Sequence, residues 1–163
     1  MNSHALAVLE FPRVLALVAE RATSSLGAER VRALRPRTDR AWLDTEHERV
    51  AAVRSLRATE PAWHPELRPD LSQPLVRLRV VGSTWTAAEL LDGAQLLRAS
   101  RLTREALTDA RRAAVARAVL APFTERLVSA RPVEDAIARV FDDDGQVRDD
   151  ASPELKRVRR ELR

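Results

Sequence analysis

The chain has 163 residues, 45% of them hydrophobic and only 4% aromatic, and its formal net charge is +4. It contains no cysteine, which excludes disulfides and thiolate metal sites. The first residues do not follow a signal-peptide pattern, and no stretch approaches the ~20 apolar residues of a membrane span. We therefore expect a cytoplasmic protein that does not enter a membrane.

The sequence is rich in Ala and Leu and has many Arg and Glu residues, all of which favour helices, while clusters of β-branched residues are scarce. The composition predicts an all-α fold, an irregular multi-helix core domain. Nearly all of the basic residues are Arg, and Lys156 is the only lysine. Such uniform use of Arg is more typical of a GC-rich genome than of a binding site, although Arg is also a good phosphate ligand.

The N-terminal third predicts a series of helices separated by short breaks. The expected ranges are His4 to about Leu9, Pro12 to about Ala22, Ser24 or Ser25 to Arg35, and Thr38 or Asp39 to about Ala58. In the second of these helices the apolar spacing predicts that Val14, Leu17 and Val18 face inward. A stretch rich in proline follows, with Pro61, Pro65, Pro69 and Pro74, and it predicts an irregular loop. Pro74 is expected to open a short helix through Arg79.

The clearest local signal is the segment Thr86-Ala87-Ala88-Glu89, which has the pattern of a capping box. It predicts a helix that continues to about Leu107. Gly93 lies inside this helix, where it costs roughly 1 kcal/mol of helix propensity, and we expect it to admit a neighbouring helix at close range.

Further helices are predicted in the C-terminal part. One, from Ala110, is expected to be cut at Pro122, and another carries the apolar stripe Val133, Ile137 and Val140. An acidic turn or small hairpin around Gly145 then spans Asp142 to Asp150.

The last segment begins with a strong helix start, in which Ser152 is a good N-cap and Pro153 suits the first helical position. Leu155, Val158 and Leu162 form its apolar stripe, and no stop signal appears before Arg163. We therefore expect a long helix that continues in a longer protein. The expected domains are a core domain over residues 1–150 and the start of the long helix over residues 151–163.

No catalytic, cofactor-binding or metal-ligating residue is predicted. The acidic turn resembles a calcium loop, but aligning Gly145 at the sixth position places Val140 first and Ala151 twelfth, where oxygen ligands are required. His4, His47 and His64 are too far apart for a zinc motif, and no phosphate loop or nucleophile elbow occurs.

Basic clusters are the remaining candidate binding residues. One group lies in the capped helix and just after it: Arg98, Arg101, Arg104, Arg111 and Arg112. The other lies in the final helix: Lys156, Arg157, Arg159 and Arg160. The final group alternates with apolar residues, so its simplest interpretation is a solvated helix face, and its alternative interpretation is a nucleic-acid contact. Neither group is interleaved with aromatic residues, as a single-strand binding surface would be.

Three segments resemble the N-terminal region of the bacterial MutS-two family, which is paralogous to the mismatch-repair protein MutS. They are LEFPRVLALVAERATSSLGAERVRALRP (Leu9 to Pro36), VVGSTWTAAELLDGAQLLRASR (Val80 to Arg101) and DDDGQVRDDASPELKRVRREL (Asp142 to Leu162). The resemblance covers nearly the whole chain. It implies a MutS-like core domain from which the helix beginning at Ser152 leaves as a lever.

The resemblance further implies a full-length protein with a clamp, an ATPase domain that uses ATP and Mg²⁺, and a small nuclease-type domain. The family is associated with binding of mismatched or branched DNA, suppression of recombination, endonuclease activity and rescue of collided ribosomes, and its members are expected to form homodimers. None of the ATPase, clamp or nuclease motifs has a counterpart in this chain.

Two hypotheses follow. The first is a non-catalytic scaffold and lever in a MutS-two-like, ATP-dependent DNA-binding protein, with DNA, the ribosome or both as partners of the whole protein. The second is a self-standing, Arg-rich nucleic-acid-binding module.

Overall fold

The computed structural model describes residues 3–59, 70–109, 114–142 and 145–161, and within these ranges it contains nine α-helices and no strand. The predicted all-α fold is therefore confirmed. The chain divides into two compact units, residues 1–70 with 106–125 and residues 71–105 with 126–163. The predicted division at residue 150 stays a prediction.

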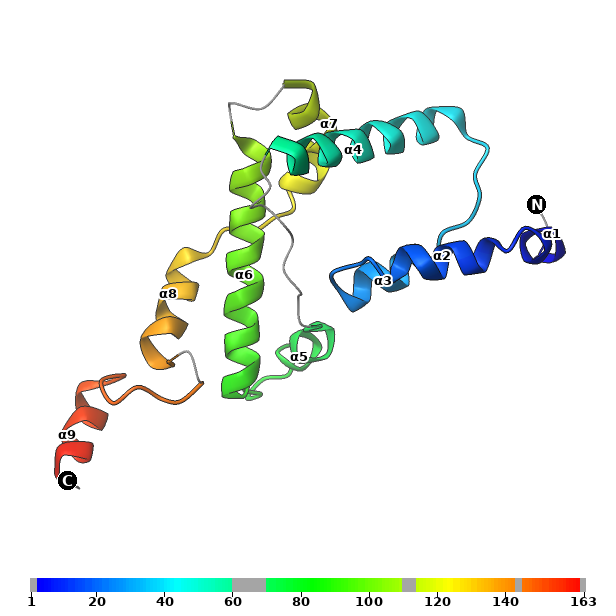
Figure 1. The fold of residues 1–163 in the computed structure, drawn as a ribbon. Coiled ribbons are helices and arrows are strands. Elements are labelled where there is room, and N and C mark those ends of the chain that lie inside the picture. Colours follow the sequence, from blue (N-terminus) through cyan, green and yellow to red (C-terminus); the bar gives the residue numbers. More distant parts are fainter. Residues whose placement is uncertain (1–2, 60–69, 110–113, 143–144, 162–163) are drawn as a thin grey trace. The chain divides into compact units, whose positions relative to one another are not determined.

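The first unit is built from five helices and also includes the last residues of a sixth, α6 (Ala87–Thr108) (Figure 1). The five are α1 (Ser3–Val8), α2 (Phe11–Ala19), α3 (Ser25–Arg32), α4 (Arg40–Thr59) and α7 (Ala114–Thr124). Glu10 turns the chain between α1 and α2 with a left-handed backbone, at φ 52°. Ser24 caps α3 as predicted, because its hydroxyl accepts a hydrogen bond from the Gly27 amide at 3.1 Å.

The predicted inward face of α2 is wrong. Val14, Leu17 and Val18 are 50%, 57% and 50% exposed, whereas Leu15 and Ala19 are buried. The physical reason is that α2 is apolar on nearly every side, so hydrophobic spacing alone could not select the face that packs on its neighbours.

Helices α4 and α7 pack against each other in the first unit, as do α2 and α3. The buried side chains of α4 and α7 include Ala52, Leu56 and Leu120. The predicted break at Pro122 is wrong, because Pro122 lies inside α7. Leu120 and Thr124, on either side of Pro122, are both buried, so packing outweighs the hydrogen bond that proline cannot donate.

The second unit contains the longest helix of the described chain. Its elements are α5 (Ser72–Arg77), α6 (Ala87–Thr108), α8 (Arg131–Val140) and α9 (Pro153–Glu161), with the last three residues of α6 assigned to the first unit. The acidic turn lies between α8 and α9. Phe141 and Val147 pair there in an isolated antiparallel bridge, as expected of a small hairpin.

Several predicted features lie outside the described residues. They include Pro61, Pro65 and Pro69 of the loop, His64, and Arg111 and Arg112 of the first basic cluster. Pro74, which was predicted to open a short helix, lies in the middle of α5.

Candidate functional site

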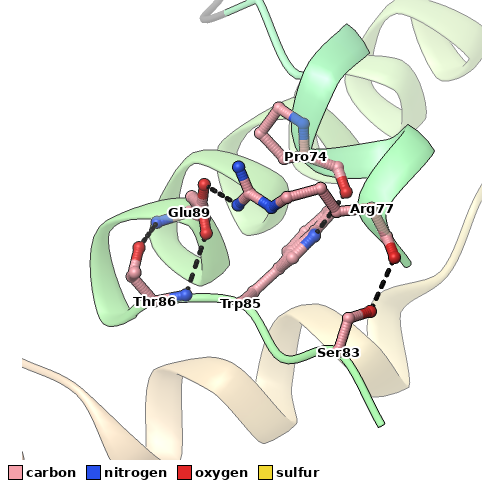
Figure 2. A network of polar contacts seen from close by, with 6 residues as sticks. All are labelled: Pro74, Arg77, Ser83, Trp85, Thr86 and Glu89. Atoms are coloured by element: carbon pink, nitrogen blue, oxygen red, sulfur yellow. Dashed lines mark hydrogen bonds and ion pairs between the residues drawn. The ribbon is translucent and has the colours of Figure 1, made fainter. Parts of the chain in front are cut away.

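The start of α6 is held by the predicted capping box (Figure 2). The Thr86 amide donates to the Glu89 carboxylate at 2.9 Å, and the Glu89 amide donates to the Thr86 hydroxyl at 3.3 Å. Arg77 from α5 forms an ion pair with the same carboxylate. The hydrogen bond from the Thr86 amide, followed by that from Arg77, lowers the pKa of Glu89 below its ordinary value of 4.5.

Trp85 joins α5 to α6 next to this cap. Its indole N–H donates to the carbonyl oxygen of Pro74 at 2.9 Å, and Figure 2 shows the ring lying between the two elements. The ring also covers Gly93, since a Cβ atom there would lie 2.7 Å from Cζ3 of Trp85. The predicted close approach at Gly93 is therefore made by an aromatic ring. The expectation that a neighbouring helix makes this approach is wrong.

The far half of α6 is clamped to α8. Arg101 donates two hydrogen bonds to the Glu134 carboxylate, at 3.0 and 2.9 Å, and a longer one to Glu105 at 3.3 Å. The side chains of Arg101 and Glu134 are only 15% and 11% exposed, so this pair is largely shielded from water. The hydrogen bonds from Arg101 lower the pKa of Glu134, and those with Glu134 raise the pKa of Arg101 further above its ordinary value.

A second contact fixes the chain where it enters α8. The Val128 amide donates to the hydroxyl of Ser100 at 2.8 Å. Ser100 and Arg101 are adjacent on α6, so both the approach to α8 and its first turn are tied to one turn of the long helix.

The turn that leads to α9 has the expected geometry. Gly145 has a φ of +77°, which L side chains rarely adopt. A Cβ atom at this position would lie 3.2 Å from Cδ1 of Leu91 of α6. Ser152 caps α9, because its hydroxyl accepts from the Leu155 amide at 3.1 Å. Both local predictions, the glycine turn and the cap, are confirmed.

The four predicted nucleic-acid contacts share one short helix but differ in their partners. Arg159 pairs with Asp149 of the turn, and Arg157 lies 3.8 Å from Glu161 in an exposed pair. Within the described residues, Lys156 and Arg160 form no ion pair, and both are exposed. They line a small hollow together with Arg159 and Asp149.

No family model matches the chain. The protein named endonuclease MutS2 of Gemmatimonas aurantiaca is 58% identical over 163 residues, covering 100% of this chain and 20% of that relative. Proteins of the same name from a Geobacillus strain and from Thermus thermophilus are 35% and 33% identical, over 100% and 97% of this chain and 21% and 20% of their own length. The chain belongs to the MutS2 family. It spans about a fifth of the length of these curated relatives, 20% of the first and 21% of the second.

The similarity to MutS2 proteins adds no site residue to those that the geometry shows. Among the described residues there is no group of three or more His, Cys, Asp or Glu side chains that could hold a metal, and His4 and His47 are both exposed. No helix in the described ranges is long and apolar enough to cross a membrane.

Sequence reasoning missed the arginines on the α6–α8 side. Arg98 and Arg101 were assigned to a basic cluster on one helix, whereas the structure brings them together with Arg131 of α8 and Arg148 of the turn along one groove. The sequence carries no local signal for this arrangement, because Arg101 and Glu134, which join the two helices, are 33 residues apart.

Proposed function

We propose that this chain is a non-catalytic helical scaffold within a MutS2-type protein. In this role α6 is the fixed element, and the path through α8, the acidic turn and α9 leads to the rest of the protein as a lever. The whole chain is similar to a part of proteins named endonuclease MutS2, which supports the family context.

The observation that carries this proposal is the set of polar ties along α6. The capping box and Arg77 hold its first turn, while Ser100 and Arg101 tie its later turns to the segment that enters α8 and to α8 itself. Paired and partly shielded ion pairs impose a defined geometry on the elements that they join. A scaffold requires such geometry, whereas an enzyme active site requires reactive groups that are kept available.

We propose that DNA, the ribosome or both are partners of the whole MutS2-type protein, which would act as an ATP-dependent endonuclease homodimer. ATP and Mg²⁺ do not fit the described part of this chain. Its helices offer no glycine-rich phosphate loop, and no acidic cluster there could hold a metal. Both groups would bind segments of the family proteins that this chain does not match.

The scaffold role is tested by assaying the purified chain for ATP hydrolysis and for nicking of supercoiled plasmid in the presence of Mg²⁺. The expected result is no activity above that of buffer, because the sequence has no glycine-rich phosphate loop and the described residues contain no cluster that could hold a metal. Activity that rises with protein concentration and disappears in a single point variant would overturn this role.

A second candidate function is a nucleic-acid-binding module that uses α9. The observation in its favour is that Lys156 and Arg160 have no ion-pair partner among the described residues. Electrostatic binding to phosphates weakens steeply with salt. Titration of labelled duplex DNA at low and at physiological salt tests this function: affinity tighter than about 1 µM at physiological salt supports it, and loss of that affinity in K156Q/R160Q assigns it to α9.

A further inference from the structure

The second unit contains an open groove of about 820 Å³ along α6, α8 and the turn. Arginines line it from three segments: Arg98 and Arg101 come from α6, Arg131 from α8 and Arg148 from the turn. Both of its long walls therefore carry positive charge. The groove lies wholly within one compact unit.

Arg101 is not available to a ligand. Its guanidinium already donates to both oxygens of Glu134, at 3.0 and 2.9 Å, and to Glu105. The side chains of Arg101 and Glu134 form the largely covered floor of this part of the groove. Arg101 is therefore engaged by two carboxylates, those of Glu134 and Glu105.

Arg98 and Arg131 line the same groove but do not belong to the Arg101 clamp. Each lies one helical turn before a member of the clamp, Arg98 before Arg101 and Arg131 before Glu134. Both line the same groove as Glu134, and the charge of both lowers the pKa of that carboxyl group, after the contribution of Arg101. Within the described residues neither forms a hydrogen bond or an ion pair, and both side chains are exposed.

Helix stability does not explain the position of Arg131. It occupies the first residue of α8, where the helix dipole disfavours a positive charge. Arg148, in contrast, lies at the opposite end of α8, where its amide donates to the Val140 carbonyl oxygen and its side chain contacts Asp150 at 3.4 Å.

The acidic residues of the groove do not neutralise this pair. Asp142 lies beyond the C-terminal end of α8, and its carboxylate accepts a hydrogen bond from the Gln146 amide at 2.8 Å. Asp135 is the one other carboxylate near Glu134 on the lining, and it also borders the neighbouring hollow with Arg139 and Arg148. Four arginines therefore face three carboxylates along the lining, which leaves one positive charge in excess.

We propose that Arg98 and Arg131 bind a phosphate group of a nucleic-acid backbone in the groove between α6 and α8. Two guanidinium groups on facing helices can each donate two parallel hydrogen bonds to one phosphate, which a lysine pair could not do. An open groove suits a continuous backbone that enters and leaves, rather than an enclosed small ligand. The choice of a nucleic acid among phosphate compounds rests on the proposed role in a DNA-acting protein.

The experiment follows the Nε–Hε signals of Arg98 and Arg131 by NMR during titration of the chain with a short DNA duplex and, separately, with inorganic phosphate. Affinity for the duplex is measured in parallel for R98Q/R131Q. The matched control is R54Q/R57Q, which removes the same charge from two exposed arginines of α4 in the other unit.

The expected result is that the duplex shifts both arginine signals at concentrations at which inorganic phosphate does not. R98Q/R131Q should bind the duplex roughly tenfold more weakly. The slope of log affinity against log salt concentration should fall by about two, because about two fewer counterions are released. R54Q/R57Q should retain most of the affinity.

Three outcomes would overturn the proposal, and each has a different meaning. Equal affinity of R98Q/R131Q and the unsubstituted chain for the duplex would exclude the groove as the binding site. DNA would then bind elsewhere, for example on α9. Shifts with inorganic phosphate but not with the duplex would exclude the nucleic acid. An absence of shifts with both ligands would exclude a phosphate site in this groove, and the scaffold role would be unaffected.

Discussion

At the residue scale, the Trp85 ring covers Gly93 so closely that a Cβ atom would not fit there. Glycine is ordinarily unfavourable inside a helix, and replacing it by alanine normally gains up to about 1 kcal/mol. Here the added Cβ would lie 2.7 Å from the Trp85 ring, which its hydrogen bond to Pro74 holds in place. The gain in helix propensity is therefore opposed by overpacking, which typically costs about 1 to 3 kcal/mol.

We predict that G93A lowers the free energy of unfolding by about 1 kcal/mol, the net of these two effects. Urea unfolding monitored by circular dichroism measures the change. The matched comparison is G93A in a W85A background, where the ring is absent and the same substitution should be neutral or stabilising. A stabilising G93A in the unsubstituted chain would show that the ring does not restrict this position.

Sequence reasoning succeeded at this scale where the chemistry is local. The capping box of Thr86 and Glu89 and the cap at Ser152 each need residues only three positions apart, so the sequence contains the whole interaction. The same reasoning identified Gly93 as a site of close approach but gave it the wrong partner. The ring that covers it comes from Trp85, and nothing in the spacing of residues indicates that this side chain turns toward α6.

The clamp between α6 and α8 determines how these elements respond to pH. Glu134 has a lowered pKa in the folded chain, whose main cause is hydrogen bonding from Arg101. A carboxyl group with a lowered pKa stabilises the fold at pH values above its ordinary value, and this contribution is lost as the pH falls through the folded value. Glu89, at the start of α6, acts in the same direction.

We predict that the urea midpoint of the chain falls as the pH is lowered from about 7 to about 3, and that E134Q reduces this dependence. At neutral pH, E134Q should itself be less stable because Arg101 loses its main partner. The control is E105Q, which removes an exposed contact at 3.3 Å and should retain the pH dependence of the unsubstituted chain. The same pH dependence in E134Q and in the unsubstituted chain would show that the clamp does not contribute to stability.

Elements were harder to predict where packing competes with local preference. Pro122 is a strong local signal for a break, yet buried Leu120 and Thr124 on either side keep α7 continuous. In α2 the difficulty is the opposite, because eight of the nine residues in FPRVLALVA are apolar and the sequence offers no polar face for comparison. The helix α8, whose apolar and charged residues are well separated, carries the predicted stripe of Val133, Ile137 and Val140, although it begins two residues before that stripe, at Arg131.

At the scale of the whole molecule, composition was sufficient to predict the helical class, and the quoted segments were sufficient to identify the family. The division into two compact units was not predicted. It depends on long-range contacts, such as those of α4 with α7, that join segments far apart in the chain. The arginine groove was missed for the same reason, since its walls come from segments separated by about thirty residues, such as Arg101 and Glu134 with their separation of 33.

The central claim is that side-chain ties along α6 make the second unit a scaffold of defined geometry. Because the chain has no cysteine, spin labels can be placed by A88C on α6 and A136C on α8, both at exposed positions. The distance distribution between these labels, measured by pulsed electron paramagnetic resonance, tests the claim most directly. We predict one narrow distribution for the doubly labelled chain, broadening when E134Q is added and no broadening with E105Q. A broad distribution in the chain without further substitutions would contradict the claim, because α6 and α8 would then move independently of each other.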